Sequence, residues 1–209
     1  MEYNVEDMKA DIRTAIDENR RSESLVLDGD TDTLSLDDVI GQKIGDAIKA
    51  VEMSAPARLL EGVSFVECKN TINQDLSGYV TLPEDFMRLV AFKISDWETG
   101  VYNAIAPSDA AYMYQKSRWG IGGNWERPVC AVVPSGDSLK LEYYRSRTAD
   151  ARIETALYRP YPAIKDGKTD VSEPLYKASV YMAAALTLMT YDDEAAAKMM
   201  TEQSNNAIK

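Results

Sequence analysis

The spacing of apolar residues changes twice along this chain of 209 residues, and this change limits the folds open to it. At both ends apolar residues recur every three or four positions, which is the period of a helix with one face on a core. From residue 62 to about residue 147, short apolar runs are broken by Gly, Pro, Asn and Asp, as in strands and turns. The order predicts an α+β fold: N- and C-terminal helices form a helical bundle, and the middle is β-rich, as a sandwich or hairpins.

Two amphipathic helices are predicted in the first part of the chain. The first covers residues 4–20, and the polar stretch that follows it has no helical period. The second has Ser35 as its N-cap, with Asp38 in an acidic first turn. It runs to about Met53, and Pro56 prevents its continuation. Each helix carries a single apolar stripe, so both must pack against other elements.

The clearest strand pattern is a β-hairpin. An apolar run at 129–133 precedes the turn sequence Pro-Ser-Gly-Asp at 134–137, after which apolar residues alternate with Lys and Glu over 139–143. Further strands are expected at 65–68, 79–82 and 89–94, and one short helix is expected at 108–115.

The last third returns to helices. Ser-Glu-Pro at 172–174 combines an N-cap, an acid and a proline, which is a helix start signal. Residues 175–191 are apolar on nearly every face, so other elements should surround this helix. A further helix follows and runs into a polar tail at 204–206. The predicted organisation is an N-terminal helical part (1–61), a β-rich insertion (62–170) and C-terminal helices (171–209) that complete a single composite domain.

The composition excludes several classes of function. The chain has no histidine, so Ser-His-Asp and Cys-His nucleophile systems and His-ligated metals are excluded. It has 23 basic against 34 acidic residues, a net charge of −11, and so lacks the basic excess that binding to nucleic acid or anionic membranes requires. The longest apolar run, 180–189, is shorter than the roughly 20 residues of a membrane span. We expect a protein made in a reducing cytoplasm, with no membrane contact.

Four candidate sites fail on their sequence context. The acidic stretch 28–32 has Asp at alternate positions like a calcium loop, but Thr33 and Val39 stand where that loop needs Gly and Glu. The glycines at 120–123 follow no apolar strand, so they predict a flexible loop. The adjacent carboxylates Glu84 and Asp85 lack the separation of an acid–base pair. Finally, Cys68 and Cys130 are predicted to be buried thiols. No catalytic, cofactor-binding or metal-binding residue is predicted, and no cofactor is expected.

Charge is distributed unevenly along the chain. Residues 1–60 hold seven basic and fourteen acidic residues (−7), whereas residues 110–170 hold ten basic and seven acidic residues (+3). One interpretation is that the faces are solvated and merely differ. The other is that the acidic end of one copy meets the basic region of the next, as complementary patches do in head-to-tail rings.

One segment resembles a known family. Residues 78–90 read Gly-Tyr-Val-Thr-Leu-Pro-Glu-Asp-Phe-Met-Arg-Leu-Val, with Trp97 behind them. This stretch resembles one in the head-to-tail adaptor proteins of tailed bacteriophages, the tail tubular protein A-like ring proteins. The layout is also similar, with an N-terminal helical pair, an acidic linker like 28–32, a β-rich middle and an alanine-rich helix like 179–187.

The resemblance implies a structural virion protein of the tail or neck, made in the host bacterial cytoplasm, with no enzymatic activity. Its partners would be further copies of itself in a dodecameric ring, the portal protein, and the next tail ring or nozzle protein. DNA would pass through the ring without specific binding. We expect the interfaces to use aromatic residues and the C-terminal segment, which ends in a polar tail. The candidate interface residues are Trp119, Trp125, Met199, Met200, Asn205, Asn206 and Ile208.

Two alternatives from other classes remain open at this stage. The first is a soluble ligand- or carbohydrate-binding module, in which Trp97, Trp119 and Trp125 stack on a sugar or base. An enzyme would have to work with Asp, Glu and Lys alone, and no spaced acid–base pair is found for it.

Overall fold

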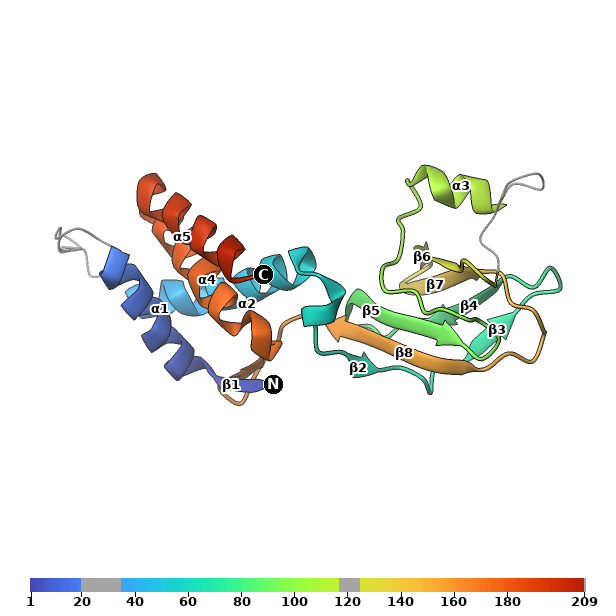
Figure 1. The fold of residues 1–209 in the computed structure, drawn as a ribbon. Coiled ribbons are helices and arrows are strands. Elements are labelled where there is room, and N and C mark those ends of the chain that lie inside the picture. Colours follow the sequence, from blue (N-terminus) through green and yellow to red (C-terminus); the bar gives the residue numbers. More distant parts are fainter. Residues whose placement is uncertain (20–34, 117–124, 209) are drawn as a thin grey trace. The chain divides into compact units, whose positions relative to one another are not determined.

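The computed structural model describes residues 1–19, 35–116 and 125–208 (Figure 1). The fold is α+β, with helices towards both ends of the chain and antiparallel sheets between them. The chain divides into two compact units, which we call the helical unit (Met1–Glu61 and Pro162–Lys209) and the β unit (Gly62–Tyr161). The β unit ends at residue 161, whereas the sequence prediction ended the β-rich insertion at residue 170.

The helical unit contains four long helices, two short 3-10 turns and a small sheet within the described residues. These elements are β1 (Glu2–Asn4), α1 (Val5–Asn19), α2 (Leu36–Ser54), η1 (Ala57–Leu59), β9 (Ile164–Lys165), β10 (Lys168–Asp170), η2 (Glu173–Leu175), α4 (Tyr176–Thr190) and α5 (Glu194–Ala207). The sheet has the order β1-β10-β9. Its pairing of Tyr3 with Thr169 places the segment after residue 161 in the helical unit.

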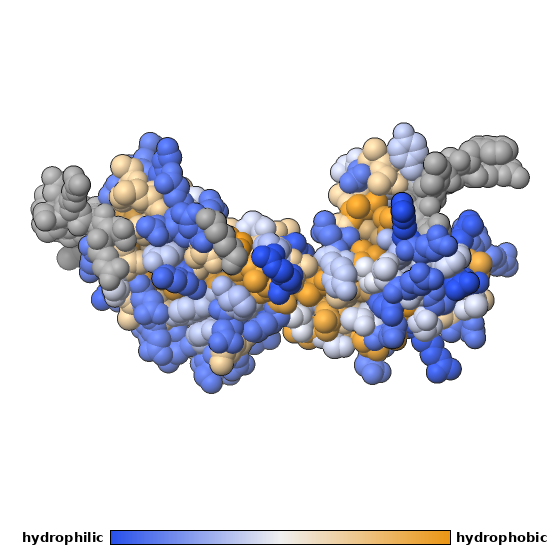
Figure 2. Space-filling model, viewed as in Figure 1, coloured by the Kyte–Doolittle hydropathy of each residue, from blue (hydrophilic) through white to orange (hydrophobic). Residues whose placement is uncertain are grey.

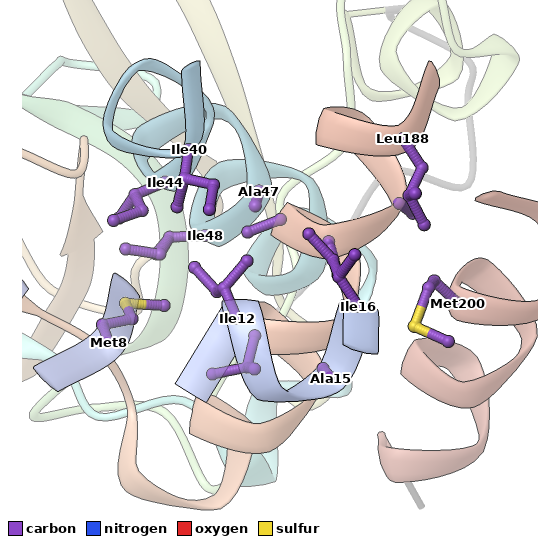
Figure 3. Close-up of a cluster of buried hydrophobic side chains, with 14 of the residues drawn as sticks. Met8, Ile12, Ala15, Ile16, Ile40, Ile44, Ala47, Ile48, Leu188 and Met200 are labelled. Atoms are coloured by element: carbon purple, nitrogen blue, oxygen red, sulfur yellow. The ribbon is translucent and has the colours of Figure 1, made fainter. Parts of the chain in front are cut away.

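The centre of the helical unit is α4, which packs against α1, α2 and α5. Many of its buried positions are alanine, so the other helices can approach it closely. Figure 3 shows isoleucines of α1 and α2 pointing towards one another in this core, with Leu188 and Met200 coming from α4 and α5. Burying one such side chain stabilises the fold by roughly 1.5–3 kcal/mol relative to leaving it exposed, so this core holds the helices together.

The start of α2 confirms the predicted N-cap. The backbone N–H of Asp38 donates to the Ser35 hydroxyl oxygen over 3.3 Å, and the Ser35 N–H donates to the Asp38 carboxylate over 3.2 Å. This reciprocal capping box satisfies two backbone donors that the helix itself leaves without partners. The hydrogen bonds from Ser35 also hold the pKa of the Asp38 carboxyl below its usual value.

The end of α5 differs from the prediction. The helix continues to Ala207, so residues 204–206 are not an irregular polar tail. Ser204 is fully buried, and its hydroxyl donates to the Ala178 carbonyl of α4 over 2.8 Å. A serine is small enough to let the two helices approach and still satisfies its own hydroxyl, so a polar residue that reads as solvent-exposed is part of the helix contact.

The β unit contains two antiparallel sheets with the orders β2-β8-β5 and β3-β4-β7-β6. Its elements are β2 (Val63–Ser64), β3 (Asn70–Ile72), β4 (Gly78–Thr81), β5 (Phe86–Ile94), α3 (Ala110–Lys116), β6 (Val129–Ser135), β7 (Ser138–Tyr144) and β8 (Ile153–Pro160). One buried cluster draws apolar side chains from both sheets, including Phe92 of β5, Tyr158 of β8 and Tyr143 of β7. The unit is thus a small β-sandwich with a single core.

The predicted β6–β7 hairpin is confirmed, with Ser135 pairing with Ser138 across the turn. Gly136 has a φ of 62°, which glycine adopts without strain. The predicted strand at 65–68 is wrong: these residues form a turn in which the Cys68 N–H donates to the Phe65 carbonyl over 3.0 Å. Strand β8, which joins β2 to β5, was not predicted.

Candidate interaction surfaces

The segment that resembles phage adaptors forms the turn from β4 into β5. Leu82 and Phe86 are buried in the core, and the Phe86 ring stacks on Tyr158 with centroids 5.8 Å apart. Between them, the Asp85 carboxylate accepts the Tyr158 hydroxyl over 2.8 Å, and the Asp85 carbonyl accepts the Tyr161 N–H over 2.8 Å. Burial, together with this hydrogen bond, raises the pKa of Tyr158 to about 12. These residues fix the fold of the β unit.

Trp97 is a core residue and offers no face to a ligand. Its side chain is 3% exposed, and its indole N–H donates to the Arg145 carbonyl over 3.1 Å. The ring meets Tyr143 edge-on at 5.5 Å and Phe92 at 5.7 Å between centroids. The expectation that Trp97 is an exposed aromatic is therefore wrong, because its indole ring fills the sandwich and its polar N–H has a buried partner.

The other predicted aromatic sites are described only in part. Trp125 is half-buried, and the Arg147 guanidinium lies 3.9 Å from its ring centroid in a cation–π contact. The backbone N–H of Arg147 donates to the Asp96 carboxylate over 2.6 Å, which holds this arginine beside the β5 exit. Trp119, the glycines at 120–123 and the acidic stretch 28–32 lie outside the described residues.

The C-terminal candidates separate into surface and core. Met199, Asn205 and Asn206 are exposed on α5, and Ile208 is half-buried just after it. Met200, in contrast, is fully buried in the core of the helical unit, so it cannot form part of a surface. Helical geometry explains the difference, because adjacent positions point about 100° apart around the axis.

The two cysteines differ in burial, and the described residues place no cluster of metal-binding side chains. Cys130 is fully buried, as predicted, and burial raises the pKa of its thiol. Cys68 is only half-buried. Among residues 1–19, 35–116 and 125–208, no three His, Cys, Asp or Glu side chains are placed to hold a metal ion. In the same ranges, no helix has the length and apolar character needed to cross a membrane.

The contrast in charge follows the two units. The sequence of the helical unit holds 12 basic and 22 acidic residues, a net charge of −10, and that of the β unit holds 11 and 12, a net charge of −1. The +3 window at 110–170 spans the boundary between the units. Figure 2 shows that the visible face of the helical unit is largely hydrophilic. The sequence of the helical unit is therefore strongly acidic, and that of the β unit is nearly neutral.

Sequence reasoning missed a surface on α3. Tyr102, Met113 and Tyr114 are 62%, 68% and 64% exposed, which are the highest values among the large apolar side chains that the structure describes. All three belong to the excursion between β5 and β6. Figure 2 shows apolar residues gathered near the start of α3. The signal in the sequence was the run Tyr-Met-Tyr at 112–114. Successive side chains of a helix point in different directions, so a helix that packs one face on a sheet buries only one of these three and exposes the others.

No protein-family model matches the chain, and no curated protein is significantly similar to it.

Proposed function

We propose that this protein is a structural subunit of a phage virion, a head-to-tail connector. Twelve copies of the chain would form a ring between the portal vertex and the tail and leave a channel for DNA. The observation that carries the proposal is the architecture: a β-sandwich, Gly62–Tyr161, is inserted into a helical unit built from both ends of the chain. This is the layout of the adaptor proteins that residues 78–90 resemble.

The position of the resembling segment supports the proposal in a specific way. Its residues hold the β4–β5 turn through Asp85, Phe86 and Tyr158. A likeness in such residues supports a shared β unit and says nothing of a catalytic site. Because one fold can serve several functions, the proposal needs a test of assembly.

The charge of the helical unit fits the same proposal. A surface with net charge −10 repels the phosphate backbone and releases no counterions on approach to it. A channel wall of this kind would let DNA pass without binding it.

The test is negative-stain microscopy of the purified protein, alone and mixed with the portal protein of the same phage. Rings with a central hole that stack on the portal are the expected result. A protein that stays monomeric and ignores the portal would overturn the proposal.

We further propose that the C-terminal segment from Met199, on α5 and just after it, docks against the portal protein, and a point variant tests this. Deleting residues 201–209 would remove the buried Ser204 and damage the helix packing, so Met199→Glu is the cleaner change. We expect this variant to bind the portal at least tenfold more weakly. The matched control is Met53→Glu on α2, because Met53 and Met199 are 49% and 47% exposed. Equal losses in both variants would contradict docking by α5.

A further inference from the structure

The α3 surface is held in place by hydrogen bonds. The Tyr112 hydroxyl donates to the Glu142 carboxylate of β7 over 3.0 Å, and the Tyr144 hydroxyl donates to the same oxygen over 3.1 Å. Tyr112 is buried, whereas Met113 and Tyr114 beside it are exposed. Two apolar side chains are therefore displayed on an anchored helix, and ordering them in a contact costs little conformational entropy.

The strand edge beside α3 is closed, so a partner cannot simply add a strand there. The Ile105 N–H donates to the Cys130 carbonyl over 2.9 Å, and the Val132 N–H donates to the Ile105 carbonyl over 3.2 Å. Further along the same edge, Pro134 has no N–H to offer. A contact at this part of the β unit must use side chains such as Met113 and Tyr114, and both residue types are enriched in interface cores.

Electrostatics indicate which surface can cover α3. The segment 101–116 has one acidic and one basic residue, and the whole β unit has a net charge of −1. Two helical units that meet would bring −10 against −10, whereas two β units meet with almost no repulsion. At α3, the helical unit of a second copy would bring −10 against the −1 of the β unit, so a second copy meets less repulsion there when it approaches with its own β unit.

We propose that copies of this protein contact one another through their β units, with Met113 and Tyr114 of α3 as the apolar anchors. This inference does not depend on the connector function. A large side chain buries about 150–250 Å² when fully covered, so the two anchors offer roughly 250 Å² per copy. A stable interface needs about 800 Å² on each partner. The contact alone is therefore weak, and it gains strength where several copies are held together in one assembly.

The first test is photo-crosslinking with p-benzoylphenylalanine in place of Tyr114, in a mixture of ¹⁴N- and ¹⁵N-labelled protein. Peptides that join the two isotopes report contacts between copies. We expect such crosslinks to reach residues 62–161 of the other copy. Crosslinks only within one copy, or only to the helical unit of another, would overturn the proposal.

The second test is analytical ultracentrifugation over a range of protein concentrations. Met113→Glu should weaken self-association at least tenfold, whereas Met53→Glu, the same change on an exposed position of α2 in the helical unit, should leave it unchanged. Circular dichroism confirms that both variants are folded. Self-association that survives Met113→Glu, or a wild-type protein that never associates, would refute the inference.

The same variants separate this inference from the connector proposal. Rings that still form on the portal with Met113→Glu would leave the connector function standing and reject the β-unit contact. Self-association that depends on Met113, in a protein that ignores the portal, would do the reverse.

Discussion

Gly78→Ala should damage the β unit severely, because Gly78 leaves room for a ring. Gly78 on β4 pairs directly with Tyr143 on β7. A Cβ at residue 78 would lie 2.1 Å from Cζ and 2.7 Å from Cε2 of the Tyr143 ring. Ordinary carbon contacts are about 3.5–4.0 Å, so the ring has to move by more than 1 Å. It has no free space, because Phe92 and Trp97 pack against it with centroids 5.7 and 5.5 Å away.

The size of the effect follows from two losses. Overpacking a core costs about 1–3 kcal/mol. The moved ring also loses the hydrogen bond from its hydroxyl to the Asn70 side chain, 2.8 Å long, which contributes about 0.5–1.5 kcal/mol. We expect Gly78→Ala to lower the free energy of unfolding of the β unit by about 2–4 kcal/mol. With a urea slope of about 2 kcal/mol/M, the midpoint falls by about 1–2 M.

The assay can follow each unit separately. All three tryptophans lie in the sequence of the β unit, so their fluorescence reports its unfolding, while far-ultraviolet circular dichroism is dominated by the helices. The control is Gly45→Ala on α2, where a Cβ meets nothing within 4 Å. Alanine is the better helix former, so this variant should gain about 0.5–1 kcal/mol.

A double-mutant cycle with Tyr143→Leu isolates the clash. Leucine removes the ring, so Gly78→Ala should cost at least 1 kcal/mol less in that background than in the wild type. A cost within about 0.5 kcal/mol of zero for Gly78→Ala in the wild-type background would refute the packing argument.

Three further predictions concern pH, capping and helix packing. Burial raises the pKa of Tyr143 and of Tyr158 from 10 to about 12. Their contribution to stability is therefore complete below pH 10 and is lost as the pH rises towards 12. Urea unfolding followed by fluorescence at pH 8 and 11 should show this loss of stability, and Tyr143→Phe should reduce the loss. Ser35→Ala removes the α2 capping box and should cost about 1 kcal/mol by circular dichroism, and no change would contradict the cap. Ser204→Ala should cost about 1 kcal/mol, whereas the exposed Asn205→Ala should stay within about 0.5 kcal/mol of the wild type in the same thermal melts.

Local signals predicted the elements that depend on local interactions. The α2 start followed from Ser35 and Asp38, because a capping box lies within four consecutive residues. The β6–β7 hairpin followed from its turn sequence, because the turn fixes the register of both strands. Helix α4 followed from its uniform apolar character, which is what a helix surrounded by others requires.

Contacts between distant residues explain what the sequence could not predict. Strand β8 has Arg159 buried near its end, so its pattern is not the simple alternation of an amphipathic strand. The unit boundary at 161 depends on β1 pairing with β10, more than 160 residues away in the chain. Ser204 was predicted to lie in a polar tail, and Trp97 to stack on a ligand in the alternative function. A single tertiary hydrogen bond accounts for the buried place of each polar group. The run at 112–114 does not say which of its side chains is buried, and the hydrogen bond from Tyr112 to Glu142 of β7 shows which face of α3 is anchored.

The residues that resemble phage adaptors and the residues that can bind partners lie in different parts of the molecule. Residues 78–90 are used for the turn and core of the β unit, so a related protein could keep them while its partners change. The choice of partner must then depend on residues that the fold does not need. Here these are the acidic residues of the helical unit and the exposed residues of the neutral α3 surface. Salt separates the two: it screens the repulsion between −10 units and leaves apolar contacts intact. If contacts form through β units, self-association should persist at high salt. Assembly steps that bring helical units together should require high salt, because salt screens their repulsion.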